Sequence, residues 1–417
     1  MTETVYSNPD VLDQDPWQLR LDEVNPAQPA LFANDVQWAY FERLRSEAPV
    51  HFCKDSDFGP YWSVTKYQDI KYVDTSYELF SSEPNIVLQD QDEDFPLPMF
   101  IAMDPPKHDR QRKEVAGVAA PRNLAALEPA IRQRVCDILD ALPVGERFDW
   151  VDKVSIELTT QMLATLFDFP FDERRKLTRW SDVATAAPMP GGIIESDEQR
   201  QGELLECLER FTHLWNERVN APPGNDLISM LAHGESTKNM EPMEYLGNLV
   251  LLIVGGNDTT RNSISGGVLA LNQNPGEYQK LRDDPSLIPN MVSEIIRWQT
   301  PLAYMKRRVL VDTELGGQHL RAGDKIAMWY VSGNRDPDMF DDPDAFVIDR
   351  PNARKHMAFG FGIHRCMGNR VAEMQLRILW EEILQRFHAV EVVGEPVRVH
   401  SSFVKGYSAL PVILHPA

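Results

Sequence analysis

The chain has 417 residues, 43% of them hydrophobic and 25% charged, which is typical of a folded globular protein. Its formal net charge is −21, and no basic tract interleaved with aromatic residues offsets it, so nucleic acid is not an expected partner. The longest apolar run, around residues 249–254, is far shorter than the roughly 20 residues that cross a bilayer, so we expect no membrane span.

The four cysteines, at positions 53, 136, 207 and 366, lie far apart without a Cys-x-x-Cys pair. This spacing disfavours a zinc knuckle or a disulfide framework. The N-terminal sequence is acidic and polar and lacks the pattern of a signal peptide. Together these features predict a cytoplasmic protein.

Two kinds of element are expected along the chain. Short strands in hairpins are predicted over 61–73 and 307–331, where β-branched and aromatic residues alternate with glycine turns. Apolar residues at three- and four-residue intervals predict the helices, which cover residues 122–142, 153–168, 198–220, 241–272, 288–299 and 367–387. No internal repeat or linker is present, so we expect one domain that is mainly α with a minor β part.

The longest predicted helix, 241–272, contains the unusual pair Gly255-Gly256 in its interior. Each glycine costs about 1 kcal/mol there relative to alanine. One explanation is close packing against another helix. The other is that the Thr259 hydroxyl bonds the Gly255 carbonyl and opens the helix locally into a groove.

Further along, Glu294 and Arg297 lie three apart on one predicted helix and are expected to form an ion pair. Taken alone, this pair is more typical of a solvated surface.

The segment 359–368 places three glycines and one thiol immediately before the last predicted helix. A cysteine at a helix N-terminus lies in the positive end of the dipole, which lowers the pKa and favours the thiolate that a metal requires. The glycines let the backbone turn toward the sulfur, and Phe359 is placed to cover it and exclude water. Cys366 is therefore the candidate metal ligand, with a small buried turn residue as the alternative.

The spacing Phe-x-x-Gly-x-His-x-Cys-x-Gly, from Phe359 to Gly368, resembles the cytochrome P-450 superfamily. The resemblance implies a single-domain P-450 fold with b-type haem held between the long helix and the cysteine-loop helix. It also implies that Cys366 is the axial ligand of the haem iron, a thiolate that favours cleavage of the O–O bond.

The segment Gly255-Gly256-Asn257-Asp258-Thr259-Thr260 is similar to the oxygen-activation motif of the same superfamily. The similarity implies that Thr259 hydrogen-bonds the oxygen being activated and that Asp258 relays solvent protons toward it. It also identifies Glu294 and Arg297 as a structural pair. Members usually add a further arginine, but Ala345 stands at its place here, so Arg350 and Arg335 both remain candidates.

Four basic residues resemble the family's ligands of the haem propionates. Two share a helical face before residue 115, and two flank the later motifs: His108, Arg112, Arg307 and His364. Buried carboxylates need such cationic or hydrogen-bonding partners.

The similarity runs from about residue 35 to the C-terminus, which leaves 1–34 as an N-terminal extension and 35–417 as the haem domain. The stretches 100–115 and 252–267 look like the soluble bacterial alkane-hydroxylating subfamily. This implies terminal hydroxylation of medium-chain n-alkanes or fatty acids, with terpenes or other small hydrophobic molecules as alternatives. Alignment to the motifs places Leu251, Val254, Gly255 and Leu302 in the substrate pocket.

The resemblance further implies O2 as co-substrate and electrons from NAD(P)H through a ferredoxin and its reductase, since no reductase domain follows the haem region. Basic residues cluster near the cysteine and are expected to attract an acidic ferredoxin: Arg110, Arg112, Lys113, Arg354, Lys355 and Arg365. A haem-thiolate peroxygenase and a non-enzymatic haem sensor are the rival functions. The paired Asp258 and Thr259 favour the monooxygenase over both.

Overall fold

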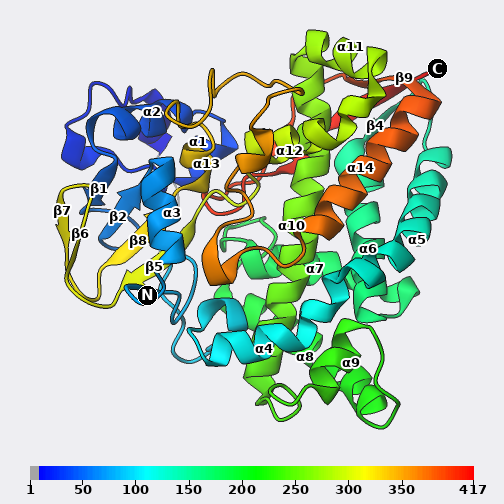
Figure 1. Ribbon diagram of the computed structural model, residues 1–417, viewed down its shortest axis with the longest axis horizontal. Coiled ribbons are helices and arrows are strands. Elements are labelled where there is room, and N and C mark those ends of the chain that lie inside the picture. The colour runs from blue at the N-terminus through cyan, green and yellow to red at the C-terminus, as the bar shows by residue number, and fades with distance from the viewer. Residues whose placement is uncertain (1–8) are drawn as a thin grey trace.

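The computed structural model describes residues 9–417, and its helices and strands occupy different parts of the molecule (Figure 1). The long helices fill the right and lower parts of the view, while most strands lie at the left beside the N-terminal segments and the short helices α1, α2 and α3. The helices are α1 (Pro29–Ala33), α2 (Trp38–Glu47), α3 (Tyr67–Thr75), α4 (Lys107–Val115), α5 (Pro121–Asp140), α6 (Glu157–Phe167), α7 (Arg175–Thr185), α8 (Asp197–Val219), α9 (Leu227–His233), α10 (Pro242–Gln273), α11 (Pro275–Asp283), α12 (Ile288–Gln299), α13 (Tyr330–Gly333) and α14 (Asn369–Arg386).

Five strands form the main sheet, in the order β1-β2-β8-β5-β3. These are β1 (Val50–Cys53), β2 (Tyr61–Val64), β3 (Phe80–Ser81), β5 (Met305–Val309) and β8 (Lys325–Met328). Only the β2–β8 pair is parallel, with Trp62 opposite Ile326. The smaller sheets join β4 (Arg147–Asp149) with β12 (Pro411–Pro416) and β9 (Phe387–Val392), β6 (Thr313–Leu315) with β7 (Gln318–Leu320), and β10 (Val397–Arg398) with β11 (Tyr407–Ala409).

The mainly α architecture confirms the sequence-based expectation, and all six predicted helices are present. The second of them begins as a π-helical turn, Val151–Ile156, before α6. The sequence patterns do not predict helices α1, α2, α7, α9, α11 and α13. Strands within 307–331 are confirmed, but the strand prediction over 61–73 is wrong beyond Val64, because Tyr67–Thr75 is helix α3. Its buried residues are Tyr67, Ile70, Val73 and Asp74, a helical spacing that the β-branched composition concealed.

Helix α10 runs through the middle of the molecule and is buried along most of its length (Figure 1). Pro242 occupies its first turn, and the helix ends before Pro275, as the stop signal predicted. Its two halves contribute to different apolar clusters: one with α5, α12 and α14, the other with α7, α8 and α9. The long helix is thus fixed from several sides.

A third apolar cluster joins the N-terminal segment to the main sheet. Val11, Leu31 and Phe32 pack there with Trp329 and Tyr304. Part of segment 1–34, which we expect from the sequence to be an extension, is therefore packed against the rest of the chain. Among residues 9–417, no helix combines the length and hydrophobicity that a bilayer-crossing segment needs.

Candidate active site

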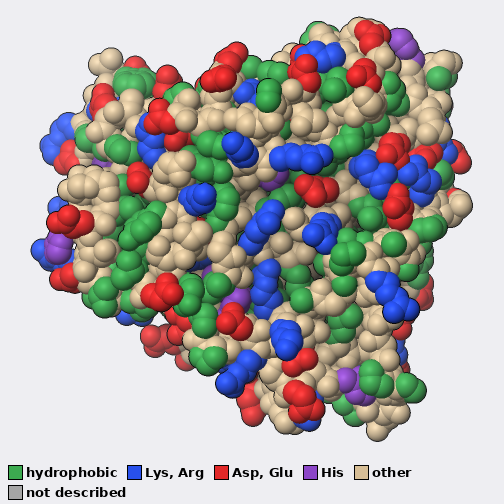
Figure 2. All heavy atoms as spheres, in the orientation of Figure 1, with side chains coloured by type: hydrophobic (Ala, Val, Ile, Leu, Met, Phe, Trp, Pro, Cys, Tyr) green, Lys and Arg blue, Asp and Glu red, His purple; other side chains and the backbone are tan. Residues whose placement is uncertain are grey.

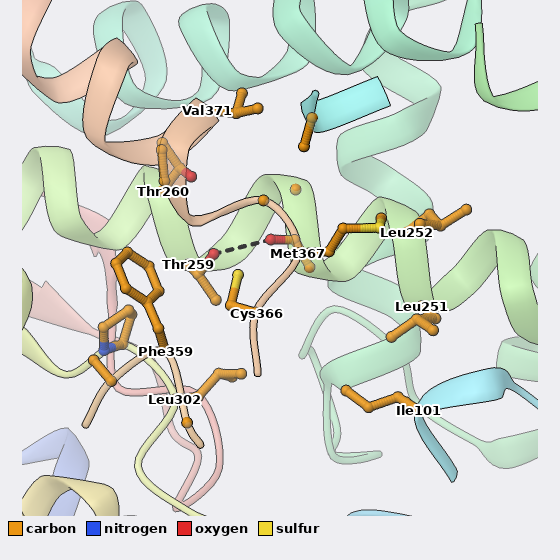
Figure 3. A pocket seen from close by; sticks show the side chains of 18 of the residues that line it. Ile101, Leu251, Leu252, Thr259, Thr260, Leu302, Phe359, Cys366, Met367 and Val371 are labelled. Carbon is orange, nitrogen blue, oxygen red and sulfur yellow. Dashed lines mark hydrogen bonds between the residues drawn. The ribbon is translucent and has the colours of Figure 1, made fainter. Parts of the chain in front are cut away.

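A large cavity lies between the middle of α10 and the loop that carries Cys366 (Figure 3). Its wall is formed by α4, α6, α10, β5, α13 and the segment 358–375. The empty volume is about 1530 Å³, part of which is open to solvent. Most of its lining side chains are apolar, so the cavity suits a ligand that is largely hydrophobic.

The Cys366 loop is closed by a hydrogen bond of 2.8 Å from the Cys366 N–H to the Phe359 carbonyl oxygen. Gly360 and Gly362 have φ angles of 64° and 63°, in the left-handed region that favours glycine. A Cβ at Gly362 would lie 2.7 Å from the carbonyl oxygen of Asp74, so the loop passes close to the end of α3. Phe359 lines the cavity beside Cys366, where the sequence placed it.

The Cys366 side chain faces the cavity (Figure 3). The residue is exposed to the cavity, but the surrounding protein atoms desolvate the thiol and raise its pKa, a shift that the Gly368 N–H, Arg112 and Arg365 partly oppose. The expected lowering of this pKa is therefore wrong for the chain alone. Helix α14 begins only at Asn369, so its N-terminus acts mainly through one N–H group, which does not outweigh desolvation. A metal bound at the sulfur would itself displace the proton.

The two glycines in the middle of α10 have different surroundings. A Cβ at Gly256 would lie 2.6 Å from Leu163 Cδ2, so α6 packs closely at this position. Gly255 lines the cavity, and a Cβ there would meet nothing within 4 Å. The Thr259 hydroxyl donates a hydrogen bond of 2.9 Å to the Gly255 carbonyl oxygen (Figure 3). Helix α10 is uninterrupted here, so this bond caps the carbonyl without breaking the helix.

Asp258 is fully buried and contacts α7 rather than the cavity. Its carboxylate accepts hydrogen bonds from Arg261 (2.6 Å) and from the Thr185 hydroxyl (3.4 Å). Arg261 also pairs with Asp182 on α7 at 2.9 Å. Burial raises the pKa of Asp258 to about 6, a shift that Arg261 opposes and Asp182 increases. The acid and the alcohol of the motif thus occupy different faces of α10.

The four expected propionate ligands converge beside the Cys366 loop. The rings of His108 and His364 have centroids 4.3 Å apart, and Arg112, Arg307 and His364 line the cavity. Both ring nitrogens of His364 and the Nε2 of His108 are buried without a hydrogen-bond partner among the described residues. Burial lowers the pKa of His364 to about 2 and also lowers that of His108. Such orphaned polar atoms indicate a missing anionic or polar partner.

The predicted pair Glu294–Arg297 is fully buried, so it is not a solvated surface pair. Two hydrogen bonds of 2.7 and 2.8 Å join the side chains. Arg350 Nε completes the network, 3.1 Å from Glu294 Oε1. Both arginines also donate to the Ala345 carbonyl oxygen, so the backbone takes part in the network. Arg335 instead pairs with Asp344 and stacks on Trp38.

Comparison with known proteins agrees with this geometry. The model of the cytochrome P450 family matches residues 111–405. The chain belongs to the cytochrome P450 family. It is 35% identical to linalool 8-monooxygenase from Pseudomonas putida over 402 residues, covering 93% of this chain and 98% of that protein.

Two solved P450 structures are more similar still. Cytochrome P450-153 from Novosphingobium aromaticivorans is 46% identical with a TM-score of 0.89, covering 96% of this chain and 100% of that one. CYP153D17 from Sphingomonas sp. PAMC 26605 is 49% identical with a TM-score of 0.90, covering 95% and 100%. The resemblance inferred from the sequence motifs is confirmed.

As a cytochrome P450 monooxygenase, the protein uses haem b, O2 and electrons from NAD(P)H that redox partners deliver. The residues of the cavity fit this cofactor. A thiol faces the space where the iron would be bound, and the orphaned nitrogens of His108 and His364 and the guanidinium groups of Arg112 and Arg307 suit two carboxylates.

The substrate side of this P450 cavity is apolar. Of the four expected pocket residues, Leu251, Gly255 and Leu302 line the wall, whereas Val254 packs into the helical cluster around α8. Sequence reasoning missed further apolar wall residues, among them Phe100, Ile101, Leu166, Leu227, Leu252 and Met305. The helical spacing of Leu252, Gly255 and Thr259 could have identified Leu252, but no periodic pattern marks Phe100 and Ile101, which lie outside the long helices.

Proposed function

We propose that this P450 hydroxylates the terminal carbon of medium-chain n-alkanes. The observation that carries the proposal is the separation of polar and apolar groups in the cavity. Its basic side chains, Arg112, Arg307 and His364, gather beside the Cys366 loop, whereas the wall near Ile101, Leu251 and Leu252 is hydrocarbon (Figure 3). An alkane gains about 25 cal/mol for each Å² that such a wall buries.

The same separation argues against a carboxylic acid as the preferred substrate. A carboxylate taken into this apolar part would need a cation or several donors to offset its desolvation. Among the described residues, no lysine lines the cavity, and the arginines there are the expected propionate partners. The resemblance of stretches 100–115 and 252–267 to the soluble bacterial alkane-hydroxylating subfamily supports an alkane as well.

In the proposed reaction, haem supplies the iron centre at which O2 is activated, and the protein supplies protons and shape. Thr259 holds a hydroxyl at the cavity wall, where it can give a proton to a nearby oxygen and regain one from Asp258. Asp258 must first leave Arg261, because that ion pair holds the carboxylate toward α7. This acid–alcohol pair favours O2 over peroxide as the oxidant, since a peroxide already carries its protons.

A ferredoxin is the proposed electron donor. Lys and Arg side chains gather in the middle of the face shown in Figure 2, over the Cys366 loop and between α4 and α14. Five of the six expected basic residues are exposed: Arg110, Lys113, Arg354, Lys355 and Arg365. On a protein of net charge −21, such a patch attracts an acidic partner to the side nearest Cys366.

Matched ligands test the substrate class. Haem-loaded ferric protein is titrated with octane, dodecane, dodecanoic acid and limonene while the Soret band is followed, and the products of dodecane turnover are then identified. We expect dodecane to shift the band at concentrations at least about tenfold lower than dodecanoic acid, and 1-dodecanol to be the main product. Tighter binding of the acid, or mainly internal alcohols, would refute the proposal.

A terpene alcohol is the second candidate substrate, because linalool 8-monooxygenase is among the similar relatives. Adding linalool to the same titration separates the candidates. A linalool affinity above that of every alkane would favour the terpene.

A further inference from the structure

Asp74 is a buried carboxylate that the proposed reaction does not use. It lies in the last turn of α3 and is 2% exposed. Its Oδ1 accepts a hydrogen bond of 2.7 Å from Arg307 Nη2. Its Oδ2 accepts two more, from the Tyr330 hydroxyl (2.9 Å) and from the Phe361 N–H (2.7 Å). A buried charge needs such partners, and here they come from three different elements.

These partners surround the cavity. Arg307 on β5, Tyr330 on α13 and Gly360 in the Cys366 loop all line it. A Cβ at Gly360 would lie 3.2 Å from Asp74 Oδ2, so the loop passes directly over the carboxylate. Asp74 therefore stands immediately behind the wall, between the guanidinium group and the cysteine loop.

We propose that Asp74 is a positioning residue for the haem. Its carboxylate turns the Arg307 guanidinium toward a propionate and anchors the loop that carries Cys366. Arg307 uses one N–H for Asp74 and another for the Lys306 carbonyl oxygen, at 2.9 Å. Its other donors remain free for a ligand in the cavity. The inference rests on the proposed role of Arg307 as a propionate ligand.

Two measurable effects follow. The groups that orient a ligand commonly change its affinity by about 10- to 100-fold, so losing Asp74 should speed haem loss. The carboxylate also adds negative charge behind the haem site and so favours ferric over ferrous iron. Its removal should make the reduction potential more positive. A purely structural effect, such as loosened packing, does not by itself predict this shift.

The main test replaces the carboxylate by an amide of the same size, Asp74→Asn. Haem transfer to excess apomyoglobin and a spectroelectrochemical titration give the loss rate and the potential. We expect loss to be about tenfold faster or more and the potential to rise. Asp69→Asn, which removes the same charge from the first turn of α3, is the matched control and should leave both values near those of the unaltered protein. An unchanged potential in Asp74→Asn would overturn the inference.

Two further variants, Arg307→Gln and the double variant Asp74→Asn/Arg307→Gln, separate the role of Asp74 from the assignment of Arg307 as a propionate ligand. If Asp74 acts through Arg307, the effects on haem loss are not additive, and additive effects would reject the inference. If Arg307→Gln alone leaves haem loss unchanged, the assignment of Arg307 as a propionate ligand is wrong.

If Asp74→Asn does not fold, Asp74→Glu is the variant that tests the proposal. It keeps the negative charge but moves the carboxylate away from its partners, so we expect a near-normal reduction potential with faster haem loss. Unchanged loss in Asp74→Glu would contradict the proposal.

Discussion

In the proposed reaction, the proton-donating role of Asp258 makes the rate of turnover depend on pH. Because its pKa is raised to about 6, the carboxyl is largely protonated below that pH and increasingly ionised above it. A group that gives up a proton works less well as its protonated share falls. We therefore expect the rate of alkanol formation, with reduced partner in excess, to decline as pH rises through about 6.

Asp258→Asn should remove this pH dependence and slow turnover by about 100-fold or more, while the Soret shift with dodecane persists. Asp182→Asn is the informative comparison, because Asp182 raises the pKa of Asp258. That variant should stay active with its pH dependence displaced to lower pH. Wild-type turnover in Asp258→Asn would show that the protons arrive by another route.

Individual site residues were predictable where motif spacing identifies them. Cys366 and Thr259 lie on the expected cavity, and Glu294 pairs with Arg297 as expected. Residues whose role depends on distant partners were not predictable. Asp74 meets Arg307 across 233 positions of sequence, and Arg350 meets Glu294 across 56. The thiol pKa was misjudged because burial is a property of the folded chain.

The contact between α10 and the loop before α4 positions Phe100 and Ile101, the part of the cavity wall that we call the roof. A Cβ at Gly247 would lie 2.1 Å from the Pro98 carbonyl oxygen, and Asn248 Oδ1 accepts a hydrogen bond of 2.9 Å from the Phe100 N–H. Together these two positions hold Phe100 and Ile101 against the substrate space.

Asn248→Ala leaves the buried Phe100 N–H unpaired, which costs about 1–3 kcal/mol. We expect that loss in the free energy of unfolding of the haem-loaded protein, measured in urea, together with weaker dodecane binding. Gly247→Ala should also lower the share of 1-dodecanol among the products, because the added methyl group displaces the loop at Pro98 and with it the roof. Gly202→Ala in α8, where a Cβ meets nothing within 4 Å, is the control and should not lower stability. Equal effects at positions 247 and 202 would contradict this account of the roof.

Helical periodicity predicted the long elements but not the short ones. Helix α10 and the five other predicted helices present repeated apolar faces over several turns. Helix α3 has only nine residues, so its helical spacing of apolar residues is too short to recognise, and its β-branched composition favours a strand instead. The packing of Val11, Leu31 and Phe32 in the cluster with Trp329 is a tertiary contact, so no local sequence pattern predicts it.

We propose that the distribution of charge over the protein favours an acidic ferredoxin as its electron donor. Net charge alone would repel an acidic ferredoxin, so reduction should depend on the basic patch near Cys366. The variant Lys113→Glu/Arg365→Glu should slow reduction by ferredoxin by about tenfold or more at low salt, and salt should diminish the difference. Lys54→Glu, in the sheet-rich part, is the control. An unchanged rate in the double variant would exclude this patch as the docking surface.

The account depends most on sulfur ligation by Cys366. The direct measurement is the absorption spectrum of the haem-loaded protein after reduction under carbon monoxide. We predict a strongly red-shifted Soret band, the signature of a thiolate ligand, and its absence in Cys366→Ala. A native protein without that band, or a Cys366→Ala variant that keeps it, would contradict the account.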